Sequence, residues 1–313
     1  MRLATVYDAV RRSSLPVIEL ASGRVPLRDL AGSKDVPAYL GELGQAVAHL
    51  GEIRAVAARW KGEPLAALER FALSVPVPNP RAFRDFYAFE QHVKTCRAQR
   101  GLGMNPAWYE QPVFYFSNPS SLVGHDAPVF APAGSVELDY ELELGVVIGQ
   151  GGRDIAPEAA WSHVAGFTII NDFSARDLQR REMAVGLGPA KGKDFATAVG
   201  PCLVTLDEFA DRIDSDGTLH LQMTACVNGR ELSRGNAADM YYKWPAIIAQ
   251  ASRDAELFPG DLLGSGTVGT GCILEIGPDA AGGWLKPGDV VELEIERIGI
   301  LRTPIVARPT AAQ

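Results

Sequence analysis

The segment 137–149, with the sequence ELDYELELGVVIG, carries a carboxylate at every second position over its first seven residues. Side chains alternate between the two faces of a β-strand, so these acidic side chains are predicted to share one face. A hard divalent cation, which binds carboxylate oxygens, would relieve their mutual repulsion. A solvent-exposed face of an antiparallel strand explains the same alternation, and the segment alone favours that simpler interpretation. The acidic residues are Glu137, Asp139, Glu141 and Glu143.

A second group of polar residues follows an apolar run in the segment 166–183, GFTIINDFSARDLQRREM. The spacing of Ser174 and Asp177 resembles a capping box and predicts a helix that begins at Ser174. Asp172 is then placed at the end of the preceding strand, where turn formation explains an aspartate without any ligand. Arginine and glutamine recur on one face of the predicted helix, as they do on many surface helices.

The only histidine with acidic company lies in the segment 80–100, PRAFRDFYAFEQHVKTCRAQR, which is predicted to be helical. Asp85 and His92 are seven residues apart and would share one helix face. Imidazole titrates near neutral pH, so His92 is a candidate general base. A half-buried histidine bonded to a neighbour is the competing interpretation. The remaining histidines are taken as structural: His49, His125, His163 and His220.

The elements that must position these residues fall into two parts. Residues 1–75 predict one helix near 40–59, and the segment VPVPNP at 75–80 predicts a boundary because proline at this density stops regular structure. Beyond it, strands outnumber helices without a regular βαβ alternation, which argues against a doubly wound sheet. Glycine-rich segments at 258–271 and 286–291 predict turns, and they lack the consecutive Lys and Ser/Thr that complete a phosphate-binding loop. The predicted helices are 80–100 and 174–184, and the predicted strands are 129–133, 137–149, 164–171, 202–206, 219–227, 271–276 and 290–301.

Composition narrows the classes of partner. The chain has 313 residues, of which 47% are hydrophobic and 22% charged, as in globular proteins. A formal net charge of −8 and a pI near 5.2 repel nucleic acid and anionic lipid, so neither is predicted as a partner. The sequence lacks an apolar run long enough to span a bilayer and an N-terminal secretory signal, which predicts a cytoplasmic protein.

Four widely spaced cysteines complete the list of reactive residue types. They form no C-x-x-C pair, so the spacing predicts neither a zinc site nor a redox motif. Buried free thiols are the prediction. The residues are Cys96, Cys202, Cys226 and Cys272.

The order of five motifs is more specific than any one of them. DFYAFEQHV, ELDYELELGVVIG, INDFSARDLQ, GKDFAT and PGDLLGSGT with CILE resemble the fumarylacetoacetate hydrolase family, in family order, from Asp85 to Val291. The resemblance implies a β-rich α+β fold, with a mixed β-sandwich roll as the catalytic domain (76–313). It also implies a smaller N-terminal accessory domain (1–75) and a homodimer.

The resemblance also assigns roles to single residues. Four carboxylates match the metal ligands of the family, and oxygen ligands without a soft one favour Mg²⁺, Ca²⁺ or Mn²⁺ over Zn²⁺. These are Asp85, Glu141, Glu143 and Asp172. His92 matches the catalytic histidine and Glu275 the glutamate that orients it. Positions that contact substrate or support the metal are matched by Lys193, Gln179, Arg176, Thr267, Tyr87 and Tyr115.

Two departures from the family pattern concern the substrate. Met183 stands where the namesake enzyme has a tyrosine, and the substrate arginine expected after the catalytic histidine has only Arg97 or Arg100 as counterparts.

The function implied is hydrolysis of a carbon–carbon bond in a small β-diketo acid of the fumarylacetoacetate or acylpyruvate type. His92 and Glu275 would activate water beside one divalent cation, with Lys193 and Gln179 as further catalytic groups. The alternative is a decarboxylase, dehydratase or isomerase that acts on a 2-oxo acid through an enolate on the same metal. Other classes are a metal- and carboxylate-binding protein without catalysis, and a purely structural domain that binds no metal.

Overall fold

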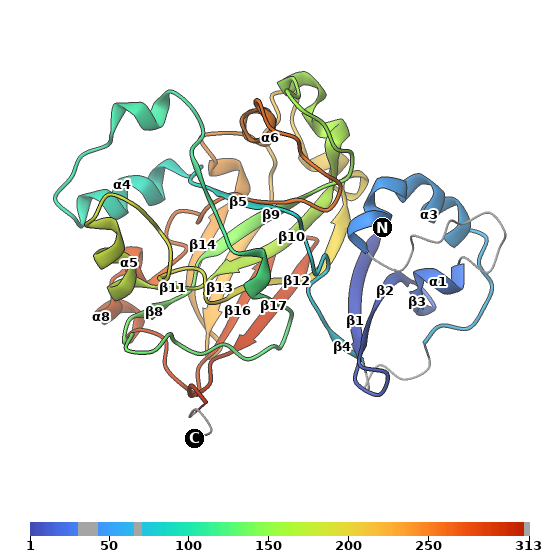
Figure 1. Ribbon diagram of the computed structural model, residues 1–313, viewed down its shortest axis with the longest axis horizontal. Helices are drawn as coiled ribbons and strands as arrows, with labels where there is room; N and C mark the ends of the chain where they lie inside the picture. The colour runs from blue at the N-terminus through green and yellow to red at the C-terminus, as the bar shows by residue number, and fades with distance from the viewer. Residues whose placement is uncertain (31–42, 66–70, 310–313) are drawn as a thin grey trace.

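The computed structural model describes residues 1–30, 43–65 and 71–309. Figure 1 shows a smaller N-terminal part beside a larger part that contains most of the strands. The smaller part contains β1 (Arg2–Asp8), β2 (Ser13–Leu20), β3 (Gly23–Pro26), α1 (Leu27–Leu30), α2 (Leu43–Ala46), α3 (Leu50–Ala57) and β4 (Phe71–Leu73). Among the described residues, no helix combines the length and the apolar character needed to cross a membrane.

The larger part is built mostly of strands. They are β5 (Phe83–Phe86), β6 (Phe114–Phe116), β7 (Leu122–Val123), β8 (Leu138–Asp139), β9 (Leu142–Ile148), β10 (Val164–Asp172), β11 (Ser174–Ala175), β12 (Thr197–Thr205), β13 (Gln222–Val227), β14 (Arg230–Asn236), β15 (Leu262–Gly264), β16 (Val290–Ile295) and β17 (Gly299–Pro304). Its α-helices are α4 (Glu90–Ala98), α5 (Arg176–Met183), α6 (Trp244–Ser252), α7 (Ile273–Ile276) and α8 (Pro278–Ala281).

Two sheets enclose the main core. Within the described residues, the large sheet has 11 strands, with the order β3-β2-β1-β12-β10-β9-β15-β5-β6 and with β4 and β7 attached to β1 and β12. A four-stranded sheet of order β14-β13-β16-β17 packs against it. All residues of β9 and β10 are buried, as expected for strands covered on both faces. The β-rich mixed architecture predicted from the sequence is therefore confirmed.

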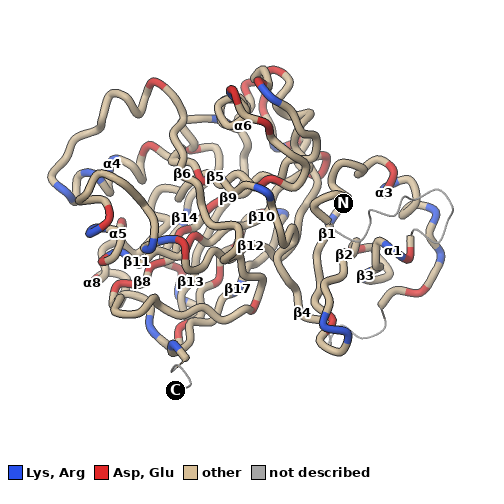
Figure 2. Tube along the Cα trace, viewed as in Figure 1, with Lys and Arg blue, Asp and Glu red and all other residues tan. Residues whose placement is uncertain are grey.

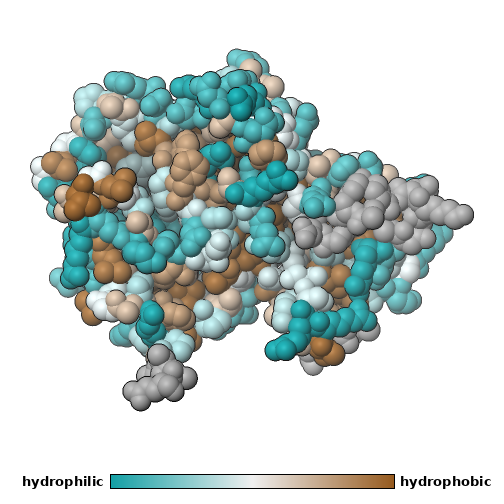
Figure 3. Space-filling view, viewed as in Figure 1, coloured by the Kyte–Doolittle hydropathy of each residue, from teal (hydrophilic) through white to brown (hydrophobic). Residues whose placement is uncertain are grey.

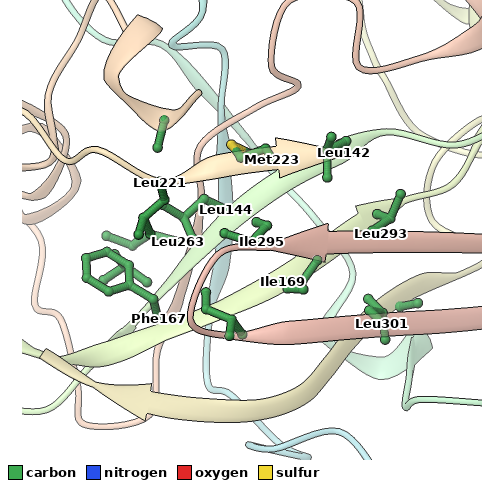
Figure 4. Close-up of a cluster of buried hydrophobic side chains, with 14 of the residues drawn as sticks. Leu142, Leu144, Phe167, Ile169, Leu221, Met223, Leu263, Leu293, Ile295 and Leu301 are labelled. Atoms are coloured by element: carbon green, nitrogen blue, oxygen red, sulfur yellow. The ribbon is translucent and has the colours of Figure 1, made fainter. Parts of the chain in front are cut away.

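Side chains from both sheets interdigitate in this core. Figure 4 shows Leu144 of β9 and Phe167 and Ile169 of β10 next to Ile295 of β16 and Leu301 of β17. These side chains are all 0% exposed, and burial of each contributes about 1.5–3 kcal/mol relative to exposure. The core therefore holds β9 and β10 rigidly, and the ends of these two strands carry the carboxylates described below.

The N-terminal part continues the large sheet. β1 pairs antiparallel with β12, with Arg2 opposite Val204 and Leu3 opposite Leu203. A second buried cluster joins Leu3 and Ile18 to Val147 of β9. We propose residue 75 as the boundary between two units, 1–75 and 76–313, that share this sheet and this cluster.

Most predicted strands are confirmed with adjusted ends. The segment 164–171 lies in β10, and 202–206 is the end of β12 plus Leu206, which begins a 3₁₀ helix. The segment 219–227 contains β13, and 290–301 contains β16 and the start of β17. Segment 137–149 is interrupted between β8 and β9, and segment 129–133 forms only a single bridge from Val129 to Ile305. The predicted helix 40–59 is α2, a 3₁₀ turn and α3 from residue 43 to residue 57, while 40–42 lie outside the described residues.

Two predicted elements have a different local structure. Segment 80–100 is not one helix, because Phe83–Phe86 pairs with β15 and β6 as strand β5 and the helix begins at Glu90. Segment 271–276 is not a strand, since Ile273–Ile276 forms the helical turn α7. Both errors arose because tertiary pairing and local hydrogen bonds overrode the apolar pattern.

The capping box at Ser174 was also wrong. Ser174 belongs to the short strand β11 and donates its hydroxyl to the Asp172 carbonyl at 3.0 Å. Helix α5 begins at Arg176, and the Asp177 carboxylate instead accepts hydrogen bonds from Ser135 Oγ and the Val136 N–H. Asp177 therefore ties the loop at Ser135 and Val136 to the first turn of α5, where its carboxylate also accepts the Leu178 N–H at 2.9 Å.

Candidate metal and catalytic site

Buried carboxylates from three strands meet within a run of four neighbouring strands of the large sheet, β10-β9-β15-β5. Asp85 is on β5, Glu143 on β9 and Asp172 at the end of β10. β15 lies between β5 and β9, with Gly264 opposite both Asp85 and Gly145. A Cβ atom on Gly264 would lie 2.2 Å from Asp85 Oδ1 and 3.1 Å from Glu143 Oε2. Glycine at this position therefore leaves room for the two carboxylates.

The geometry of this group fits a divalent cation. One carboxylate oxygen from each of Asp85, Glu143 and Asp172 lies within 4.8 Å of the others. Glu143 Oε2 is buried and has no hydrogen-bond partner. Burial together with the neighbouring carboxylates raises the pKa of Asp85 to about 7 and raises the pKa of Glu143 well above its usual range. An oxygen-only set of this kind suits Mg²⁺, Ca²⁺ or Mn²⁺.

Neutral and cationic donors surround the Asp172 carboxylate. Lys193 Nζ donates to Asp172 Oδ2 at 2.6 Å, and the Tyr115 hydroxyl donates to the same oxygen at 2.5 Å. Thr197 Oγ1 donates to Asp172 Oδ1 at 3.1 Å. Tyr115 also lies 3.3 Å from Asp85 Oδ2. Tyr115 and Lys193 thus contact the carboxylate cluster directly.

Glu141 lies next to this cluster but not inside it. Its carboxylate accepts hydrogen bonds from Lys193 Nζ and, at 2.8 Å, from Arg176 Nη2. Burial opposes ionisation, but Lys193 and Arg176 lower the pKa of Glu141 overall. Glu141 is therefore charged in this arrangement, while three other carboxylates provide the closest set of oxygens.

Arg176 joins two of the acidic residues predicted to share a face. Its Nε donates to Asp139 Oδ2 at 2.8 Å, and its Nη1 donates to Gln179 Oε1 at 3.1 Å. Asp139 was not assigned a role from the sequence, although the alternating carboxylates drew attention to it. Its carboxylate also accepts the backbone N–H groups of Ile273 at 2.7 Å and Leu274 at 3.0 Å. Asp139 therefore connects Arg176 to the turn that carries Glu275.

His92 and Glu275 form a buried pair. The imidazole Nδ1 of His92 lies 2.7 Å from Glu275 Oε2, and the Tyr87 ring meets the His92 ring edge-on with 5.4 Å between centroids. Burial opposes the charged imidazolium, but hydrogen bonds with Cys272 and Glu275 raise the pKa of His92 to about 10. Asp85 and His92 lie on different elements, β5 and α4, so the predicted shared helix face was wrong.

Four residues singled out in the sequence remain to be placed: Thr267, Arg97, Arg100 and Met183. Thr267 Oγ1 lies 3.4 Å from Glu143 Oε1. The Nε atoms of Arg97 and Arg100 donate to the carbonyls of Gly103 and Cys96, away from the carboxylates. Met183 is 42% exposed at the end of α5.

The surface around the site has its own features. A cavity of about 240 Å³ has Tyr115, Asn118, Pro189 and Lys193 among its lining residues, and two of these, Tyr115 and Lys193, also contact Asp172. Figure 2 shows acidic and basic positions interleaved around β8 and β11. In Figure 3, hydrophobic side chains are visible at the end of the molecule that contains α4 and α5. Val185 and Leu187, in the segment that directly follows α5, are exposed apolar residues.

Comparison with known proteins gives matches to relatives that are enzymes. The family model of the fumarylacetoacetate (FAA) hydrolase C-terminal domain matches residues 81–306. The human mitochondrial oxaloacetate tautomerase FAHD2A is 34% identical over 254 residues, which are 80% of this chain and 75% of that protein. The 2,4-didehydro-3-deoxy-L-rhamnonate hydrolase of Sphingomonas sp. (strain SKA58) is 37% identical over 198 residues, which are 62% of this chain and 65% of that protein.

A solved structure extends the likeness to almost the whole chain. Maleylpyruvate hydrolase from Sphingobium sp. SYK-6, in complex with manganese (II) ion and pyruvate, matches with a TM-score of 0.70 at 23% identity. The match covers 99% of this chain and 100% of that chain and establishes a shared fold. Because the family model spans most of the sequence and the human relative is matched over three quarters of its length, this chain is an enzyme of the fumarylacetoacetate hydrolase family.

Proposed function

We propose that this enzyme hydrolyses a carbon–carbon bond in a small β-diketo acid of the fumarylacetoacetate or acylpyruvate type. The observation that carries the proposal is the buried His92–Glu275 pair, 2.7 Å apart. His92 lies within Coulombic reach of Glu141, beside the cluster of three carboxylates. A histidine held by a carboxylate is suited to moving a proton, which a binding protein does not need. The relative that is named a 2,4-didehydro-3-deoxy-L-rhamnonate hydrolase supports hydrolysis as the reaction.

We propose Asp85, Glu141, Glu143 and Asp172 as the residues that hold one divalent cation. When bound, that cation supplies Lewis-acid polarisation of a substrate carbonyl. The manganese named in the structure of maleylpyruvate hydrolase supports an ion of this class. Lys193, which contacts Glu141 and Asp172, places a positive charge beside an acidic substrate and thereby favours its binding.

The proton-moving step belongs to His92. Glu275 fixes the imidazole through Nδ1, which leaves Nε2 to take a proton from water. A cation held by the neighbouring carboxylates would repel the imidazolium and so favour the neutral ring that this step needs. Hydroxide then adds to the carbonyl, and Lys193 and Gln179 donate hydrogen bonds to the oxyanion. Collapse of the oxyanion breaks the carbon–carbon bond, and the leaving carbon takes up the proton that His92 removed from water. Tyr87, Tyr115, Arg176 and Thr267 are proposed to line and orient the substrate.

A second candidate is an isomerase or tautomerase of a 2-oxo acid, with decarboxylation and dehydration as related reactions. Two observations favour it. The human relative is named an oxaloacetate tautomerase, and the raised pKa of His92, about 10, suits a group that donates a proton to carbon or oxygen. This reaction needs no attacking water.

A substrate screen separates the two candidates. Acylpyruvates, fumarylacetoacetate-type diketones and oxaloacetate are each incubated with Mn²⁺ or Mg²⁺, with His92→Ala as the control. Hydrolysis yields two carboxylic products, whereas tautomerisation changes only the ultraviolet absorbance of the enol. We expect cleavage of a diketo acid that falls by about two to three orders of magnitude in His92→Ala. Turnover of the enol of oxaloacetate alone would replace the proposal with the second candidate.

A further inference from the structure

Two cysteines that are distant in sequence lie beside the His92–Glu275 pair. Cys96 is one helical turn after His92 on α4, and its Sγ is 3.8 Å from both ring nitrogens. Cys272 immediately precedes α7, and its Sγ is 3.6 Å from Glu275 Oε2. Both cysteines are free and buried. The pair is therefore surrounded by two thiols that the proposed reaction does not use.

The spacing of these groups matches a metal site with soft ligands. Ligand atoms of His92, Cys272 and Glu275 all lie within 4.8 Å of one another. In a tetrahedral zinc site, bonds of about 2.0–2.3 Å place neighbouring ligand atoms roughly 3.3–3.8 Å apart. The two sulfur distances, 3.6 and 3.8 Å, agree with this spacing. The 2.7 Å contact between His92 Nδ1 and Glu275 Oε2 is shorter, so these atoms must separate slightly to admit an ion.

A second observation also points to a ligand. Glu275 Oε1 is buried without a hydrogen-bond partner, and the Glu275 side chain is only 1% exposed. A buried carboxylate oxygen without a partner is costly, and coordination to a cation is one way to satisfy it. The carboxylate cluster has no sulfur ligand among its residues, so the two groups prefer cations of different softness.

We propose that Cys96, Cys272, His92 and Glu275 form a binding site for a thiophilic divalent cation of the Zn²⁺ or Cd²⁺ class, distinct from the carboxylate cluster. Coordination replaces the thiol protons, which pass to the solvent, with sulfur–metal bonds, and no electrons are transferred. Two thiolates, one carboxylate and one divalent cation leave a net charge of −1. Arg176 lies within Coulombic reach of both sulfurs and opposes that charge.

Occupation of this site has a consequence for activity. A cation bound to His92 and Glu275 prevents the imidazole from moving a proton, so it inhibits the enzyme while the carboxylate cluster remains available to Mg²⁺. The existence of the site does not depend on the proposed function. Only the inhibition rests on it, through the role of His92.

Cobalt reports sulfur coordination directly. We expect Co²⁺, added to reduced enzyme saturated with Mg²⁺, to produce a near-ultraviolet charge-transfer band from thiolate to cobalt. The band is lost in Cys272→Ser and weakened in Cys96→Ser. Cys226→Ser is the matched control, because Cys226 is more accessible and lies on β13, and it should keep the full band. Wild-type enzyme without the band, or a band lost in Cys226→Ser, would overturn the proposal whatever the other variants do.

Inhibition separates the site from the proposed function. With Mg²⁺ saturating, Zn²⁺ should inhibit the wild-type enzyme, and Cys96→Ser should need about tenfold more Zn²⁺ for the same fractional loss of its own activity. A cobalt band without zinc inhibition would support the site and contradict the role of His92. Inhibition that is equal in Cys96→Ser and the wild type would contradict the involvement of Cys96.

Discussion

The Asp139 carboxylate accepts a hydrogen bond from Arg176 Nε at 2.8 Å and, at the same time, holds the backbone N–H groups at the start of α7. One buried carboxylate thus couples the side chain that contacts Glu141 to the turn that carries Glu275. The position of Glu275 relative to the carboxylate cluster therefore depends on Asp139. Within the described residues, the Asp139 carboxylate is hydrogen-bonded to Arg176, Ile273 and Leu274 and to neither His92 nor a proposed cation ligand.

Asp139→Asn should lower kcat by about 10²-fold, because loss of the charge loosens the turn that positions Glu275. The affinity for Mn²⁺ should stay near that of the wild type, since no proposed ligand is changed. Steady-state kinetics and a Mn²⁺ titration measure the two effects. Asp177→Asn is the control, because Asp177 is bonded to Ser135 and Val136 instead. Equal losses in both variants would contradict a positioning role.

Glu275→Gln should lower the pKa of His92 from about 10 toward its ordinary value of 6.5. The raised pKa stabilises the folded metal-free protein fully below pH 6.5, and this contribution is lost as the pH rises through about 10. The stability deficit of Glu275→Gln should accordingly be largest below pH 6.5 and shrink toward pH 10. Titration of the His92 ring by NMR and urea unfolding at several pH values check both statements. A stability deficit of Glu275→Gln that grows with pH would contradict this prediction.

Gly264→Ala should weaken the binding of Mn²⁺ by at least about tenfold, because the added Cβ would lie 2.2 Å from Asp85 Oδ1 and must displace that carboxylate. Gly51→Ala is the control, since a Cβ at Gly51 in α3 meets no atom within 4 Å. Calorimetric titration of both variants with Mn²⁺ gives the comparison. Unchanged affinity in Gly264→Ala would show that Asp85 does not hold the ion.

Lys193→Met should destabilise the metal-free protein by about 3–5 kcal/mol, because Glu141 and Asp172 lose a buried cationic partner. Saturation with Mn²⁺ should recover part of this loss, and activity should remain about 10²–10³-fold below the wild type. Thermal unfolding with chelator and with Mn²⁺ provides the measurement. Lys191→Met, which changes a lysine whose side chain is 76% exposed, should leave both properties unchanged.

Residues with a strong local signal could be predicted from the sequence. The continuous apolar character of β10 placed Asp172 at the end of a buried strand, as the structure has it. The alternation of Glu141 and Glu143 also predicted two carboxylates that point toward one region. Motif order added His92 and Glu275, which the structure brings within 2.7 Å although 183 positions separate them.

Relations that depend on tertiary pairing could not be predicted in this way. Asp85 lies on a strand because β5 pairs with β15 and β6, and the surrounding aromatic residues fitted a helix equally well. Cys96 and Cys272 came together only through the contact of α4 with α7, which spacing along the chain does not reveal. Of the predicted buried free thiols, three are buried and Cys226 is half-buried.

The central claim is that one divalent cation binds the carboxylates next to His92 and is required for turnover. The most direct measurement is a Mn²⁺ titration of chelator-treated enzyme, followed in parallel by calorimetry and by activity on the substrate found in the screen. We predict one ion per chain, with activity rising in proportion to occupancy, and loss of both in Asp172→Asn. Full activity in the chelator-treated enzyme, or binding that survives in Asp172→Asn, would contradict the claim.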